Sequence, residues 1–113
     1  MELEVINISY EIENDEGLSY LHFETKDGYY SISRLDEDDE LYMELNEQSN
    51  GKYFSPDCFE FDFYNGDISF YVDEDRELDV GIYQNITLKF EPVDIERFKE
   101  MGVALEKIFK EFF

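Results

Sequence analysis

Residues 58–73, CFEFDFYNGDISFYVD, contain the stretch that decides the fold. Apolar side chains recur at every second position on both sides of Asn65-Gly66. This period places one face of each strand in a core and leaves the other in water. Asn-Gly between two such runs is the strongest local hairpin signal, since a type I′ turn needs positive φ at both central residues. We expect a hairpin whose acidic, tyrosine-bearing outer face is either plain solvated surface or a docking surface.

Alternating apolar and polar residues predict further strands before this hairpin. They span residues 3–12, 18–25, 29–35 and 41–46. The first is expected to place Ile6, Ile8, Tyr10 and Ile12 on one face. The second offers Leu21 and Phe23 to one side, and Tyr20 and His22 to the other. Turn-forming residues at 13–17 and 26–28 connect the first three strands.

Less regular segments follow the fourth strand. Residues 47–56, EQSNGKYFSP, form a connection that is long for a hairpin loop, so it either carries function or crosses the sheet. Residues 73–79 are an acidic loop, and residues 80–83 are predicted as a short edge strand. A last strand is expected to turn Ile86, Leu88 and Phe90 inward.

The final segment changes to a helical period. After Pro92, apolar residues recur at spacings of three and four: Ile95, Phe98, Met101, Leu105, Ile108, Phe109 and Phe112. Asp94 is the expected N-cap, and Gly102 allows close approach to the sheet. The sequence thus predicts one α+β domain over residues 1–113, with six to seven mostly antiparallel strands within 3–91 and one amphipathic helix, 94–112, packed on one face.

Composition limits the classes of partner. Thirty acidic against nine basic residues leave a net charge of −21, yet eleven Phe and nine Tyr supply enough apolar area to fold. Nucleic acid and anionic membrane surfaces are poor partners, because their binders neutralise phosphates with Lys and Arg. A basic protein partner is favoured, whereas the plainest alternative is acidity that serves solubility.

The charge is concentrated outside the predicted helix. Residues 93–113 hold five acidic and four basic residues, so residues 1–92 carry a net charge of −20. If the helix covers one face of the sheet, most of this charge lies on the uncovered face and in the loops.

Metal, cofactor and catalytic signals are weak. Cys58 is the only cysteine, which excludes an internal disulfide and leaves a zinc site without support. His22 is expected at a half-exposed strand position rather than as a general base. Residues 36–40, DEDDE, lack the glycine-centred loop of a calcium site, so only weak cation binding is expected there. We expect no cofactor and no metal, and a cytoplasmic protein, since neither a leader nor a membrane-spanning run is visible.

Two segments, YYSISR at residues 29–34 and YMELNEQSNG at residues 42–51, carry a resemblance that continues into the strands and closing helix that follow. In these segments the chain resembles the immunity protein 10 family of bacterial polymorphic toxin systems. The residues that carry it are Arg34, Tyr42, Glu44, Leu45, Gln48 and Gly51. Glu47 and the glycine-poor segment 52–56 depart from the family pattern. The resemblance implies a small cytoplasmic protein that binds and silences a cognate toxin domain, often a nuclease.

The leading functional hypothesis is therefore a non-enzymatic toxin inhibitor that acts as a monomer or weak homo-oligomer. Its expected partner-binding residues lie on one outer sheet face: Tyr42, Glu44, Glu60, Asp62, Tyr64, Tyr71 and Asp73. The acidic loop adds Asp36, Glu37, Asp38 and Asp39. Tyrosine gives contact area at low entropic cost, and carboxylates give orientation and charge pairing.

Two other functions remain open at this point. A nucleic-acid mimic would bind many basic DNA-binding proteins, whereas an immunity protein has one partner encoded next to it. An acidic interaction module without a toxin partner is the third reading. Catalysis is disfavoured, because no nucleophile–base motif, phosphate loop or metal-ligand spacing accompanies the abundant carboxylates.

Overall fold

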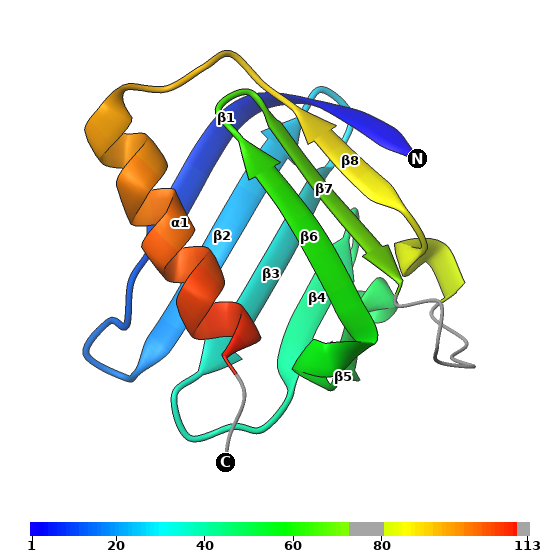
Figure 1. The fold of residues 1–113 in the computed structure, drawn as a ribbon. Coiled ribbons are helices and arrows are strands. Elements are labelled where there is room, and N and C mark those ends of the chain that lie inside the picture. Colours follow the sequence, from blue (N-terminus) through cyan, green and yellow to red (C-terminus); the bar gives the residue numbers. More distant parts are fainter. Residues whose placement is uncertain (73–80, 111–113) are drawn as a thin grey trace.

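One mixed sheet dominates the computed structural model, which describes residues 1–72 and 81–110 (Figure 1). Within these residues the strands are β1 (Glu2–Glu11), β2 (Leu18–Thr25), β3 (Tyr29–Leu35), β4 (Leu41–Leu45), β5 (Lys52–Phe54), β6 (Phe59–Tyr64), β7 (Asp67–Val72) and β8 (Ile86–Lys89). Their order across the sheet is β5-β4-β3-β2-β1-β8-β7-β6. All neighbours pair antiparallel except β1 and β8, which are parallel.

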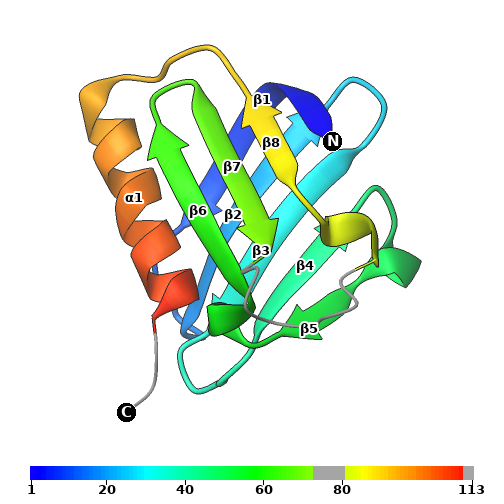
Figure 2. The same ribbon diagram turned by 45° about the vertical axis from the view of Figure 1, so that its right-hand side comes forward.

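The sheet curls until its two halves face each other. Figures 1 and 2 show β6–β8 lying across from β2–β4, with the helix α1 (Ile95–Phe109) beside the opening between them. Tyr30 of β3 and Phe70 of β7 meet across this space, with ring centroids 5.8 Å apart. Phe70 also stacks on Phe109 of α1, and Phe63 of β6 stacks on Phe98. The core therefore lies between the two halves and is closed by the helix.

The predicted α+β class, the helix packed on the sheet and the central hairpin are confirmed. Phe59, Ile68 and Phe70 are buried, while Glu60 and Asp62 are exposed on the opposite face. Asn65 and Gly66 form the two-residue loop, but only Gly66 has positive φ, at 108°, so the turn is not the expected type I′. The side-chain amide of Asn65 is bound instead to the backbone of Val93, which holds the chain before α1 against the hairpin.

The helix begins as predicted and buries the predicted stripe. The Asp94 side chain accepts a hydrogen bond from the backbone N–H of Arg97, 2.9 Å away, as an N-cap does. Met101, Leu105 and Ile108 are fully buried. Ile95 is 62% exposed, contrary to prediction. Phe112 and the loop 73–79 fall outside the described residues.

Three strand predictions are wrong in detail. Ile6 is 67% exposed, because a β-bulge between Val5 and Asn7 shifts the register of β1 and turns Val5 and Ile8 inward. The 47–56 connection contains a strand, β5, which is too short to show a period. The predicted edge strand 80–83 is instead a 3-10 helix over Gly81–Tyr83. The φ of 55° at Gly81 is incompatible with an extended strand. Val80 lies outside the described residues. The strand count therefore exceeds the expected six to seven, at eight within the described residues.

Candidate partner-binding surfaces

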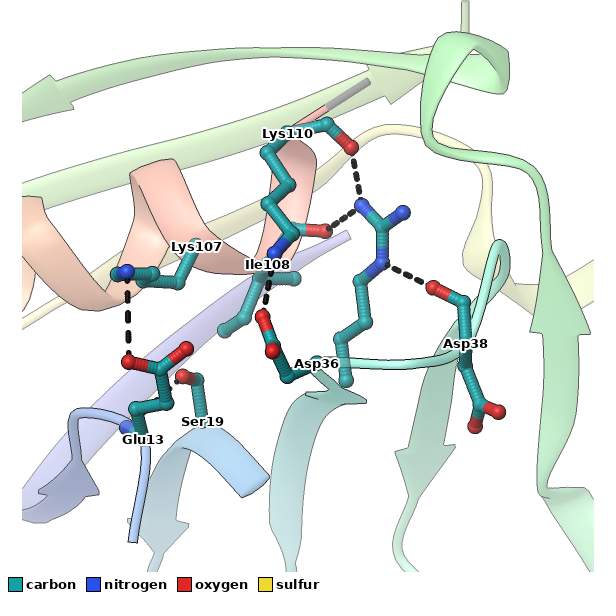
Figure 3. A network of polar contacts seen from close by, with 8 residues as sticks. Glu13, Ser19, Asp36, Asp38, Lys107, Ile108 and Lys110 are labelled. Atoms are coloured by element: carbon teal, nitrogen blue, oxygen red, sulfur yellow. Dashed lines mark hydrogen bonds and ion pairs between the residues drawn. The ribbon is translucent and has the colours of Figure 1, made fainter. Parts of the chain in front are cut away.

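The fold divides the predicted partner-binding residues among three places. Tyr42 and Glu44 lie on β4, whereas Glu60, Asp62 and Tyr64 lie on β6. Five strands separate β4 from β6 in the sheet order, namely β3, β2, β1, β8 and β7, so the two groups belong to opposite halves of the curled sheet (Figure 2). The acidic loop follows β3 and lies near the end of α1 (Figure 3). Asp73 lies outside the described residues.

The outward residues of β6 and β7 form what we call the acidic face: Glu60, Asp62, Tyr64 and Tyr71. Glu60 pairs with Tyr71 across the two strands, and Tyr64 is 67% exposed. Partial burial raises the pKa of Tyr71, and the neighbouring Asp62 and Glu60 carboxylates raise it further. At the rim, Lys89 of β8 forms an ion pair with Asp67. This face thus presents exposed carboxylates beside phenol rings.

A second surface occupies the outer side of β2 to β5, and we call it the tyrosine face. Its residues are Tyr20, His22, Tyr29, Ser31, Ser33, Tyr42, Glu44 and Tyr53. Strand register sets Glu44 beside Ser31, and Tyr42 between Ser33 and Tyr53. Tyr42 and Tyr53 have ring centroids 4.9 Å apart, and His22 stacks on Tyr29 at 5.3 Å.

Glu44 is the polar centre of the tyrosine face. The Tyr42 hydroxyl donates to its Oε2 at 2.6 Å, and the Tyr29 hydroxyl donates to its Oε1. These two bonds lower the pKa of Glu44, because both stabilise the ionised carboxylate. The same bonds to Glu44 raise the pKa of Tyr29 and of Tyr42 to about 12. The three side chains therefore form a fixed unit at neutral pH, with a charged carboxylate between two neutral phenols.

Backbone features next to β4 hold this unit in place. A Cβ on Gly51 would lie 1.8 Å from the Tyr42 hydroxyl oxygen, so only glycine leaves room for that ring. The Asn50 side chain donates to the Leu45 carbonyl at 2.7 Å. The buried Tyr83 hydroxyl donates to the Asn50 carbonyl, and the Met43 carbonyl oxygen lies 3.2 Å from the same hydroxyl. The segment that follows β4 is thus fixed to the core below Tyr42.

The acidic loop is tied to α1 by Arg34 (Figure 3). Arg34 is 3% exposed and points inward from β3. Its Nη1 donates to the carbonyl of Ile108 at 3.0 Å and to that of Lys110, and its Nε donates to the carbonyl of Asp38 at 3.0 Å. These carbonyls include the last of the helix, which have no partner within it. Arg34 therefore joins β3, the loop and the helix end.

Ion pairs with α1 also engage part of the loop. The Nζ of Lys110 lies 2.5 Å from Oδ1 of Asp36, and this contact lowers the pKa of the Asp36 carboxyl. Lys107 lies 3.5 Å from Glu13, in the turn before β2. Glu37 and Asp39, by contrast, are exposed. Asp36 and the backbone of Asp38 thus have structural contacts, while Glu37 and Asp39 remain accessible.

Tyr29 and Arg34 are the residues whose roles the sequence left unassigned. Alternation in YYSISR places Tyr29, Ser31 and Ser33 on one face, which would have revealed the tyrosine face had β3 been paired with β4. Arg34 falls on the inward set, where an arginine needs buried acceptors. Nothing in its sequence neighbourhood names the carbonyls of Ile108 and Lys110 as those acceptors.

Two further features complete the description. A surface depression of about 890 Å3 lies between β1 and the segment that follows β8, and Ile6, Pro92 and Arg97 are among the residues that line it. In the described part of the chain, no three His, Cys, Asp or Glu side chains are grouped as a metal site, and no helix is long and apolar enough to cross a membrane.

The chain thus offers two chemically different outward surfaces on one sheet, an acidic face of exposed carboxylates and a tyrosine face organised around Glu44. Comparison with family models, with curated proteins and with solved structures finds no match to this chain.

Proposed function

We propose that this protein is an immunity protein, which binds a cognate bacterial toxin domain of the basic nuclease class and inhibits it in the cytoplasm of the producing cell. The observation that carries the proposal is the acidic face, where Glu60 and Asp62 are exposed around Tyr71. The resemblance of residues 29–34 and 42–51 to an immunity protein family supports the same function.

Charge complementarity gives the physical reason. A nuclease holds phosphate with Lys and Arg, so its substrate-binding surface is basic. A protein with a net charge of −21 is steered toward such a surface, and its carboxylates occupy the positions that phosphates would take. The exposed loop residues Glu37 and Asp39 extend the same negative field. The function is inhibition by binding, without catalysis.

A pull-down from the native host tests the proposal. With this protein as bait and moderate salt in the wash, we expect one stoichiometric partner that carries a toxin domain. A set of unrelated basic proteins that is lost as salt rises would indicate nucleic-acid mimicry or unspecific charge instead. Recovery of no partner would contradict the proposal.

Matched charge variants then locate the surface. Glu60→Gln with Asp62→Asn removes two negative charges from the acidic face, and we expect the association rate with the captured toxin to fall about threefold to tenfold at low salt. Glu96→Gln with Glu100→Gln removes the same charge from exposed positions on α1 and is the control. If the two double variants associate equally fast and protect cells equally well, binding does not use the acidic face.

A further inference from the structure

Glu44 is a half-buried carboxylate that forms no ion pair with a lysine or arginine of the described residues, and the nearby His22 makes a lesser contribution to stabilising its charge. The ion pairs that the structure describes involve Asp67, Glu13 and Asp36, each with a lysine, and none involves Glu44. Within residues 1–72 and 81–110 its polar partners are two neutral phenols, Tyr29 and Tyr42. The carboxylate is nevertheless held in its ionised form, since both phenols donate to it. A fixed, partly desolvated negative charge of this kind is suited to a cation from outside the chain.

We infer that Glu44 and its flanking rings form a binding site for the guanidinium group of an arginine presented by a protein partner. The site lies on the tyrosine face, apart from the acidic face of the proposed function. The site is inferred from the side-chain contacts around Glu44, so the inference does not depend on which toxin the protein inhibits.

The hydrogen-bonding capacity of Glu44 fits arginine. An ionised carboxylate has about four acceptor positions on its two oxygens. Tyr29 uses one position on Oε1 and Tyr42 uses one on Oε2. One position on each oxygen is left, which matches the two parallel N–H donors of a guanidinium. A lysine ammonium is a compact point charge and would gain less from this arrangement.

Aromatic rings stand on both sides of the carboxylate. The His22–Tyr29 stack lies on one side, and the Tyr42–Tyr53 pair lies on the other. A guanidinium plane stacks on such ring faces, and the gain is largest where water is partly excluded. Tyr53 is 62% exposed, so its ring is accessible from solution.

The site is organised before any ligand binds. Both hydroxyls fix the Glu44 rotamer, and Gly51 holds the Tyr42 ring against the backbone. The amide N–H and the carbonyl of Tyr29 are bound to Asn46, which fixes that strand end. Binding a side chain here therefore costs little ordering of the protein. On the acidic face, Glu60 and Asp62 are more exposed than Glu44, and Asp62 is hydrogen-bonded to Tyr71.

A titration with Nα-acetyl-arginine amide, followed by carbon NMR of the side-chain carboxyls, tests the inference. We expect the Glu44 signal and the Tyr42 ring signals to shift and saturate at millimolar ligand. Glu60 and Asp62, in the same sample, are expected to show small, non-saturating shifts that salt removes. Nα-acetyl-citrulline amide, the uncharged isostere, is expected to leave Glu44 unmoved. A Glu44 shift equal to that of Glu60, or equal for arginine and citrulline, would overturn the inference.

Two variants separate the site from general effects on folding. Tyr42→Phe keeps the ring and removes one donor, and we expect it to weaken arginine binding about threefold to tenfold. Glu60→Gln removes one charge elsewhere and is expected to leave binding within about twofold once salt screens the long-range field. Equal losses in these two variants would show that net charge, and not the arrangement around Glu44, attracts the ligand. Both outcomes are independent of whether a toxin is recovered in the pull-down.

Discussion

The acidic face and the tyrosine face contain the same residue types but organise them differently. Glu60 and Asp62 extend into water from β6, so their charges act over distance and are screened by salt. Glu44 on β4 is enclosed by two phenols and by the rings that flank them. The first arrangement raises the rate at which a basic partner arrives, and the second fixes where one side chain of a partner binds. Carboxylate count alone does not distinguish these roles.

Among the variants considered, replacing Gly51 by alanine is expected to have the largest effect on stability. It tests how strongly the tyrosine face depends on this glycine. Gly51→Ala places a methyl group where the Tyr42 ring lies, so the ring must move, and this displacement disturbs its hydrogen bond to Glu44. We expect a loss of about 2 kcal/mol in the free energy of unfolding, from overpacking. Urea denaturation measures it.

The matched control for Gly51→Ala lies on α1. A Cβ on Gly102 would be 3.4 Å from the Phe63 ring, an ordinary contact, and alanine favours the helix. Gly102→Ala should therefore stabilise the protein by up to about 1 kcal/mol. If both variants lose stability equally, the tyrosine face is not uniquely dependent on glycine.

Removing one carboxylate from each face compares their energetic roles directly. Glu44→Gln leaves an amide that accepts only at its oxygen, so one of the two phenols loses its acceptor. We expect a loss of about 1–2 kcal/mol, moderated by the solvent that reaches this half-buried site. Glu60→Gln should change stability by less than about 0.5 kcal/mol, as exposed substitutions usually do. Thermal and urea unfolding of both variants measure these losses. A larger loss of stability in Glu60→Gln than in Glu44→Gln would contradict the comparison.

Local pattern was sufficient for most of the strands that form the two faces, but not for the three-residue strand β5 that carries Tyr53. Period-two alternation predicted β6 and β7 with their acidic side, and period 3.6 with Asp94 predicted α1. Tyr42 and Glu44, two residues apart on one strand, were predicted to share a face for the same reason.

Long-range pairing was not predictable from these patterns. The parallel contact of β1 with β8 joins residues more than eighty positions apart, and it sets β4 and β6 in opposite halves of the sheet. The bulge that turns Ile6 outward is a register shift between β1 and β2, and no glycine in the sequence marks it. Tyr29 reaches Glu44 only because β3 and β4 pair in one register, Tyr30 opposite Leu45. Single-strand alternation carries no such register.

Titration with alkali gives a spectroscopic comparison of the two faces. The Tyr29 and Tyr42 pKa values of about 12 lie above the ordinary value of 10.0, because their protons are donated to Glu44. Their contribution to stability is complete below pH 10 and is lost as pH rises through 12. For Glu44, whose pKa is lowered, the contribution is present above its ordinary value of 4.5 and is lost as pH falls.

Phenolate absorbance near 295 nm measures this effect. In Glu44→Gln we expect two tyrosines to ionise at lower pH than in the wild type. In Glu60→Gln the Tyr29 and Tyr42 titrations should be unchanged, because that residue lies on the other half of the sheet. Superimposable curves for wild type and Glu44→Gln would contradict the hydrogen-bonded unit.

Salt is expected to have the smallest effect and to act mainly through the acidic face. With a net charge of −21, like-charge repulsion opposes the folded state, and added salt screens it. We expect a rise in Tm of roughly 2–5 °C between low and moderate salt. Glu60→Gln with Asp62→Asn should reduce this rise, because it removes exposed repelling charges, whereas Tyr42→Phe should leave it unchanged. A Tm that falls with salt would mean that the ion pairs Lys89–Asp67, Lys107–Glu13 and Lys110–Asp36 outweigh the repulsion.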